Sequence, residues 1–179
     1  MVTLDRPRRL ALLALALMAA PGAAQAAPAT GNAAARAQIN GGLTLVRTTD
    51  LSFGDLIAAP VPGTVVVSPT ADTRTLTGVT PAGGTVRAAR FTGRGTPGRL
   101  AFVRWTTAPI ILSRIGGGAS MTMDQLRTNS ILFVFGGSDP RIIPASGILD
   151  IRFGARLQVG ANQMEGEYQG TFDITLDYQ

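Results

Sequence analysis

The stretch that decides the fold is YQGTFDITLDY, residues 168–178, at the carboxyl end of the chain. From residue 171 onward, apolar and polar side chains alternate without exception. The apolar side chains are Phe172, Ile174, Leu176 and Tyr178, and the intervening ones are Thr171, Asp173, Thr175 and Asp177. Successive side chains of a β-strand point to opposite faces, so this period of two predicts a strand with one face on a core and the other in water.

Upstream of this strand, short apolar segments alternate with separators rich in glycine and proline. The other segments that we expect to be strands are 37–39, 43–47, 51–53, 64–68, 73–77, 85–91, 99–105, 110–113, 120–123, 131–135 and 148–159. Gly154 marks an expected bend or bulge in the last of these. Residues 121–129 have weak helical spacing, and we expect a strand that runs into a loop. Short strands at this spacing are typical of an all-β sandwich or barrel.

The first 26 residues have the order of a secretory signal peptide. Three arginines come first, an unbroken apolar run follows at 10–20, and the small-residue pattern AQA closes the segment at 24–26. The run is shorter than the roughly 20 residues that a membrane-spanning helix needs. The alternative is a buried N-terminal helix. We expect cleavage after Ala26 and an exported mature chain without a membrane span, in the periplasm, outside the cell or on its surface. The export route, general secretory or twin-arginine, stays open.

Composition excludes several kinds of chemistry. The 179-residue chain has a net charge of +5, no histidine and no cysteine, and all of its 16 basic residues are arginine. It therefore has no Ser-His-Asp triad, no histidine- or thiolate-bound zinc, no Schiff-base lysine and no disulfide. We expect a protein that is not an enzyme and has no cofactor or metal. Glu165 and Glu167 suggest a carboxylate pair or calcium ligands, but a solvated turn explains them better. A hydrolase would have to rely on carboxylates or tyrosine alone.

Arginines gather in the middle of the chain. Residues 73–123 contain seven arginines and no acid: Arg74, Arg87, Arg90, Arg94, Arg99, Arg104 and Arg114. Five of them, Arg87, Arg90, Arg94, Arg99 and Arg104, form a candidate face for an anionic partner such as a surface glycan. Arg104 beside Trp105 suggests a stacking site, although we expect Trp105 to lie in the core. The alternative is that these arginines are outward-facing strand positions in water. Nucleic acid is not an expected partner, because there is no basic helix and export removes the chain from it.

The order of several motifs resembles one known family. The motifs are LSFG at 51–54, GTVVVSP at 63–69, AARF at 88–91, GGGASMTM at 116–123, FGARLQV at 153–159 and GEYQGTFDITLDY at 166–178. Together they resemble the domain of unknown function 4402 family, whose members are exported bacterial proteins without an assigned activity. The resemblance implies a secreted β-sandwich similar to fimbrial subunits and spore-coat-U-like proteins. It supplies no catalytic residue.

The resemblance and the alternation together give the expected organisation. We expect a signal peptide (1–26), a flexible N-terminal arm (27–36) and an immunoglobulin-like, pilin-like antiparallel β-sandwich (37–179). Phe172, Ile174, Leu176 and Tyr178 then form a candidate assembly strand, and Tyr178 occupies the penultimate position that holds a tyrosine in pilins. Expected partners are another copy of the chain, through strand complementation, or a periplasmic chaperone. The arm has only alanines as anchors, so a self-completed monomer that binds anionic glycan is the alternative.

Overall fold

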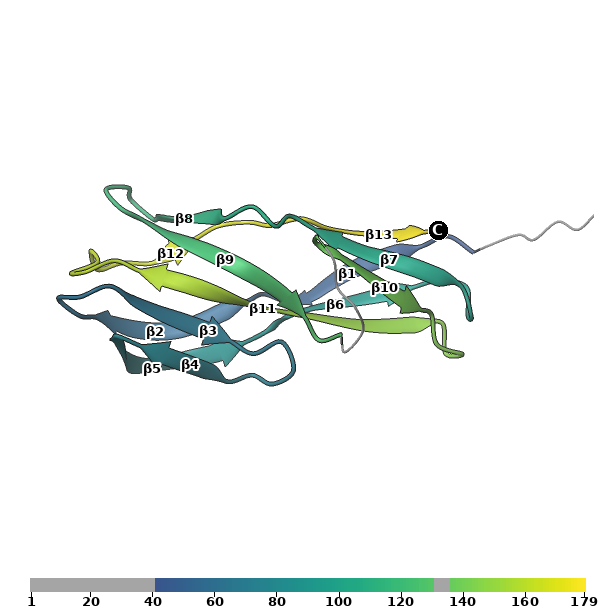
Figure 1. Ribbon diagram of the computed structural model, residues 1–179, viewed down its shortest axis with the longest axis horizontal. Helices are drawn as coiled ribbons and strands as arrows, with labels where there is room; N and C mark the ends of the chain where they lie inside the picture. Colours follow the sequence, from purple (N-terminus) through teal and green to yellow (C-terminus); the bar gives the residue numbers. More distant parts are fainter. Residues whose placement is uncertain (1–40, 131–135) are drawn as a thin grey trace, which may run out of the picture. The chain divides into compact units, whose positions relative to one another are not determined.

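The computed structural model describes residues 41–130 and 136–179. Within them all regular structure is β, every strand pairing is antiparallel, and no helix occurs. The predicted all-β sandwich is confirmed (Figure 1). The strands, in chain order, are β1 (Thr44–Thr49), β2 (Ser52–Ala58), β3 (Gly63–Val67), β4 (Arg74–Thr77), β5 (Val79–Arg87), β6 (Ala89–Arg94), β7 (Leu100–Trp105), β8 (Ile110–Arg114), β9 (Ser120–Thr128), β10 (Ser138–Ile142), β11 (Ile148–Val159), β12 (Tyr168–Gln169) and β13 (Ile174–Tyr178). The expected strands at 37–39 and 131–135 lie outside the described residues.

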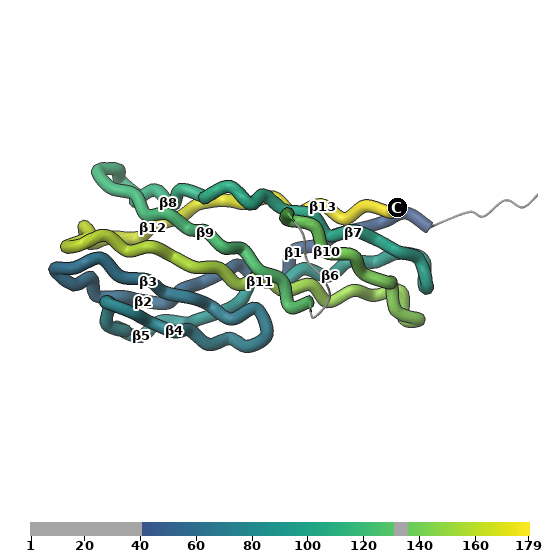
Figure 2. The backbone as a smooth tube through the Cα atoms, in the orientation of Figure 1, coloured from purple at the N-terminus to yellow at the C-terminus, as the bar shows by residue number. Residues whose placement is uncertain are grey.

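The strands form three sheets. The largest has the order β1-β6-β11-β9-β8-β12, and β3 joins it by pairing with both β11 and β4. A three-stranded sheet has the order β10-β7-β13, and β2 pairs with β5 alone. Strand β11 is the longest. Along one edge it pairs first with β6 and then with β3, while its other edge pairs with β9. Figure 2 shows this long strand running through both halves of the domain.

Two buried clusters make up the core, and β11 contributes to both. The first core lies between β2 and the strands of the large sheet, and its members are Phe53, Val65, Val67, Ala88, Leu112, Met123, Ala155, Leu157 and Val159. The second core lies between the three-stranded sheet and the strands β6 and β11, and its members are Ala89, Phe91, Ala101, Val103, Trp105, Ile143, Leu149, Ile151 and Phe153. Phe172 packs against both.

Aromatic rings meet edge to face at the junction of the two cores. Phe153 is fully buried, and its ring centroid lies 5.2 Å from that of Trp105 and 6.0 Å from that of Phe91, at interplanar angles of 77° and 86°. These angles are favourable for ring quadrupoles. The expected core position of Trp105 is confirmed, since 9% of it is exposed.

Position 154 on β11 has room for glycine but not for a residue with a side chain. A Cβ at this position would lie 2.2 Å from the carbonyl oxygen of Val67, which is far inside contact distance. The register between β11 and β9 shifts between Gly154 and Arg156, which confirms the predicted bulge. At the same point β11 changes its partner from β6 to β3.

The structure corrects several expectations about strands. Residues 85–91 form the end of β5 and the start of β6 instead of one strand, and the stretch 81–84 is part of β5 instead of a separator. Residues 121–129 form no loop, since β9 continues to Thr128 with a positive φ at Gln125. Strand β10 at Ser138–Ile142 is not among the expected strands. Residues 168–178 divide into β12 and β13, because 170–173 pair with no strand.

Replacing Phe153 with alanine should test the junction. The substitution removes a ring that contacts both Phe91 and Trp105, and we expect a loss of about 3–5 kcal/mol in the free energy of unfolding. Ile142→Ala is the matched control, because 67% of Ile142 is exposed and truncation there should change stability by less than about 0.5 kcal/mol. Chemical denaturation of both variants measures the difference. Equal losses would contradict the assigned core.

Candidate functional site

Strand β13 carries the predicted assembly residues, and the structure keeps their alternation. Ile174, Leu176 and Tyr178 are half-buried against the second core, while Thr175 and Asp177 are exposed. Phe172 precedes the strand and lies with its ring centroid 6.4 Å from that of Phe91. The four apolar side chains therefore share one inward face, as the sequence predicts.

The edges of the three-stranded sheet differ in how they are protected. Among the described residues, β13 and β10 each pair with β7 alone, so both are edge strands. Strand β10 contains Pro140, whose ring removes a donor. The Trp105 amide donates to Gly137 O and the Ile143 amide donates to Arg99 O across the pair of β7 and β10, so alternate residues of β10 face β7. Pro140 is one of the residues that face away, and the N–H that it lacks would therefore have pointed to the outer edge. Strand β13 contains no proline, and its register with β7 is regular over five residues.

No strand in the described ranges pairs with the outer edge of β13. The amide of Gln179 donates to Leu100 O, which places the N–H groups of Thr175, Asp177 and Gln179 toward β7. The N–H and C=O groups of Ile174, Leu176 and Tyr178 consequently point away from the sheet. Strand β1 approaches this edge, but its pairing partner within the described part of the chain is β6. Pairing-competent edges of this kind attract further strands unless they are covered.

Tyr178 closes the sandwich at the end of β13. The Thr96 amide donates to its hydroxyl oxygen at 2.7 Å, and the hydroxyl donates to Gly41 O at 3.1 Å. The Gly41 amide in turn donates to Thr96 Oγ1 at 2.8 Å. These three residues, here called the tyrosine clasp, join the beginning of the described chain to its last strand. The alternation placed Tyr178 on the core, but nothing in the sequence indicated its polar partners.

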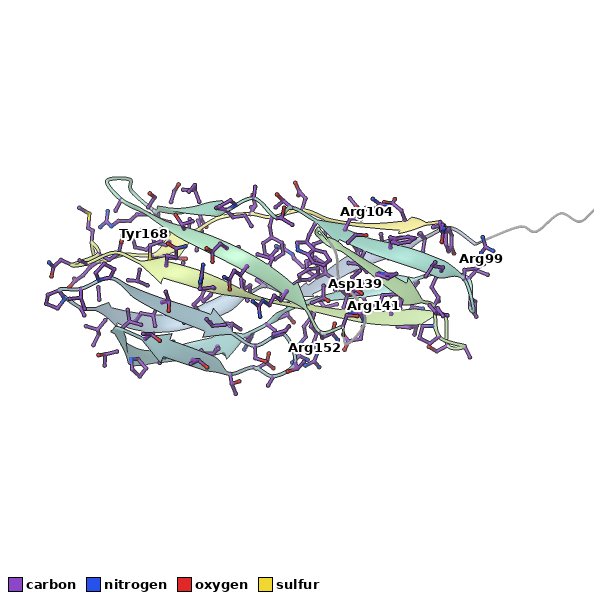
Figure 3. The ribbon with its side chains drawn as sticks, in the orientation of Figure 1. Arg99, Arg104, Asp139, Arg141, Arg152 and Tyr168 are labelled. Carbon is purple, nitrogen blue, oxygen red and sulfur yellow. The ribbon has the colours of Figure 1, made fainter. Side chains whose placement is uncertain are left out.

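The five candidate arginines are distributed over several elements. Arg87 ends β5, Arg90 and Arg94 lie on β6, Arg99 precedes β7, and Arg104 lies on β7 in the other sheet. Figure 3 shows Arg99 and Arg104 apart from one another. The five side chains therefore come from strands of three different sheets or from the residue before β7, and Arg90 and Arg94 share one face of β6.

Two of these arginines already have acidic partners. Arg90 forms an ion pair with Asp72, and Arg104 lies 3.9 Å from Asp177. The guanidinium of Arg104 stacks over Phe102, 5.4 Å from the ring centroid. The suggested stacking with Trp105 is wrong, because consecutive residues of β7 face opposite sides and Trp105 points into the core.

Sequence reasoning missed two ionic clusters. Asp139 is fully buried on β10 and accepts from Arg141 Nε at 2.8 Å and from Thr128 Oγ1 at 2.9 Å. On β9, Asp124 accepts from Arg156 Nε and Nη2, both at 2.8 Å, and from Gln158 Nε2 at 2.6 Å. The pairs join residues that are distant in sequence or that lie in a stretch resembling a turn, so no sequence pattern marked them.

Hydrogen bonds with charged groups and backbone amides shift the pKa values of three side chains. The hydrogen bonds from Arg156 hold the pKa of Asp124 below its ordinary value, and the same contact raises the pKa of Arg156. The Ala88 amide lowers the pKa of Asp72, with help from Arg90. Glu165 and Glu167 are exposed, and no group of three potential metal-ligating acids occurs in the described ranges.

Comparison with protein families supplies an identity for the fold. Residues 43–178 match the model of the domain of unknown function DUF4402. The chain belongs to this family. No curated protein and no solved structure matches it. Within residues 41–130 and 136–179 of this DUF4402 protein, no helix has the length and apolar character needed to cross a membrane.

Removing the hydroxyl of Tyr178 should loosen the clasp. Tyr178→Phe keeps the ring but leaves the Thr96 amide without its acceptor, and we expect a loss of about 1–2 kcal/mol in the free energy of unfolding. Tyr168→Phe is the control for a tyrosine hydroxyl at a different place, since that hydroxyl donates to Met164 O in an exposed loop. Thermal or denaturant unfolding measures both. A Tyr178→Phe protein as stable as the parent would contradict the clasp.

The Asp124–Arg156 pair should make the free energy of unfolding depend on pH in the acidic range. The unfolded chain takes up a proton at Asp124 before the folded chain does, so this contribution is complete above about pH 5 and is lost as pH falls through and below about pH 4. Asp124→Asn should flatten that part of the curve of unfolding free energy against pH. Asp150→Asn, which alters an exposed carboxylate on β11, should leave the curve unchanged. Identical curves for the two variants would refute the assignment.

Proposed function

We propose that this chain is an exported, non-catalytic structural protein of pilin-like type, at the cell surface or in the periplasm, which assembles through the free edge of β13. The observation that carries the proposal is the difference between the two edges of the three-stranded sheet. Pro140 blunts the outer edge of β10, whereas none of the strands that the structure describes pairs with the outer edge of β13, which β1 approaches. Natural sheets blunt their exposed edges, so an unprotected one has a use.

The partner on this edge is a β-strand with apolar side chains at alternate positions. About five ladder hydrogen bonds contribute about 1 kcal/mol each, and their sum lies near the lower end of the association cost of roughly 4–15 kcal/mol. Backbone pairing alone therefore does not hold two subunits together. Side chains that pack beside the half-buried Leu176 and Ile174 have to supply the difference, at about 0.8 kcal/mol for each buried CH₂.

The N-terminal arm of a second copy, or a strand of a periplasmic chaperone, fits this description. The signal-like order of residues 1–26 supports export. The expected arm, residues 27–36, lies outside the part of the chain that the structure describes. The anionic-glycan alternative has less support, because the five arginines are distributed over three sheets and two of them are already paired with acids.

Deleting the arm should separate strand donation from a monomeric state. We expect large species on size-exclusion chromatography for the mature chain and their loss when residues 27–36 are removed. Because the chain has no cysteine, Thr175→Cys on β13 combined in turn with a cysteine at Ala33, Ala34 or Ala35 should give disulfide-linked ladders on non-reducing gels. Thr75→Cys on β4 replaces Thr175→Cys in the control.

The outcomes of this experiment are distinct. Ladders with Thr175→Cys but not with Thr75→Cys support pairing of the arm with β13. A monomer both with and without residues 27–36, together with no ladder for any cysteine pair, would contradict self-assembly through this edge.

A further inference from the structure

A groove lies at the end of the domain where β11 ends, away from the tyrosine clasp. It has a volume of about 410 Å³, and β3, β4, β9, β11 and the loop after β11 line it. The hydrogen-bonding side chains that line it are Thr64, Thr77, Ser120, Thr122, Gln158 and Gln163. Figure 3 shows Tyr168, whose hydroxyl accepts from Gln163 Nε2 at 2.8 Å, at this same end.

Four of these side chains form one continuous row. The pairing registers place Thr77 opposite Thr64, Thr64 opposite Gln158, and Gln158 opposite Thr122. Adjacent strands are about 4.8 Å apart, so the row crosses four strands over about 14 Å. A row of this length suits a ligand that repeats a hydrogen-bonding unit along its length.

The hydroxyl and amide side chains of the groove can form further hydrogen bonds. Within the described part of the chain, no hydrogen bond engages the hydroxyls of Thr64, Thr77, Ser120 or Thr122. Each hydroxyl offers one donor and two acceptor positions. The amide of Gln158 donates to Asp124, which leaves its carbonyl oxygen available to a ligand.

The lining of the groove has no charged side chain. The neighbouring ions, Asp124 and Arg156, are joined by two hydrogen bonds of 2.8 Å and neutralise one another. An anionic ligand would find no free cation in the lining, and a cationic ligand would find no free carboxylate. The groove therefore selects an uncharged ligand.

The loops that border the groove, here called its rim, contain exposed apolar residues and are held in place. Val61 and Met164, which neighbour the lining residues Pro62 and Gln163 in sequence, are 59% and 50% exposed. The Asn162 amide donates to Ala59 O at 2.8 Å, and Arg114 Nε donates to Glu165 O at 2.6 Å, so the loops around the groove are tied to one another. Preorganised loops lower the cost of binding. Apolar rim atoms suit the C–H faces of sugar rings, whose edges carry hydroxyls.

From this geometry we infer that the groove binds a segment of a neutral glycan chain. The Thr77–Thr64–Gln158–Thr122 row bonds to the sugar hydroxyls, and the rim contacts the ring faces. Strand β13 takes no part, so the site goes beyond the proposed assembly function and does not depend on it.

Titration calorimetry with defined oligosaccharides tests the inference. The probes are hexasaccharides of glucose, mannose and xylose in several linkages, with oligogalacturonate as an anionic probe. The purified full-length chain should bind at least one neutral hexasaccharide and not the anionic one. Raising NaCl from about 50 mM to about 500 mM should leave Kd unchanged, because no ion pair forms.

Single substitutions test whether the groove is the binding site. Thr122→Ala and Gln158→Ala should each weaken binding about tenfold, which corresponds to about 1.4 kcal/mol for a lost hydrogen bond. Thr75→Ala is the matched control, an exposed threonine two residues from Thr77 on β4 but outside the groove. Equal melting temperatures show that the variants are folded.

Three results would overturn the inference. The first is no binding of any neutral hexasaccharide by the folded parent chain. The second is binding that is confined to the anionic probe or is lost in salt, and the third is full affinity in both Thr122→Ala and Gln158→Ala. Trimming residues 27–36 should leave binding intact whether or not it abolishes assembly, so failure of one proposal is distinguishable from failure of the other.

Discussion

The fold depends on one strand that serves two cores. Strand β11 holds Ile151 and Phe153 in the second core and Leu157 and Val159 in the first. To do so it must exchange its neighbour β6 for β3 without a break, and Gly154 is the residue that permits the exchange. Any side chain there would collide with the end of β3, so the two halves would lose their shared strand.

The sequence predicts those parts of the fold in which a local residue pattern directly reflects the local backbone conformation. The inward face of β13 and the bulge at Gly154 follow from period-two alternation and from an isolated glycine. Strand β10 escaped prediction because Ser138-Asp139-Pro140 has the composition of a turn. The buried carboxylate of Asp139 is stabilised by Arg141 and Thr128, and an edge position tolerates Pro140. Both circumstances depend on tertiary neighbours.

A similar limit applies to the candidate surfaces. Arginines that are close in sequence suggested one basic face, and the fold places Arg90 on β6 of the large sheet and Arg104 on β7 of the three-stranded sheet. The groove shows the reverse situation, because Thr64, Thr122 and Gln158 are far apart in the chain and come into line only through strand register. Hydroxyl and amide residues are common on strand surfaces, so no local pattern distinguishes these three from the rest.

The tyrosine clasp also has a consequence for the kinetics of folding. Its bond between Tyr178 and Gly41 spans 137 positions, and β13 has to reach back to β7 before the three-stranded sheet is complete. Topologies dominated by such distant contacts fold slowly, in milliseconds to seconds. If the chain emerges with its amino end first, the early strands are present before β13. Strand β7 then lacks one of its two partners until the final residues arrive. During that interval the nascent chain is most in need of protection from its neighbours.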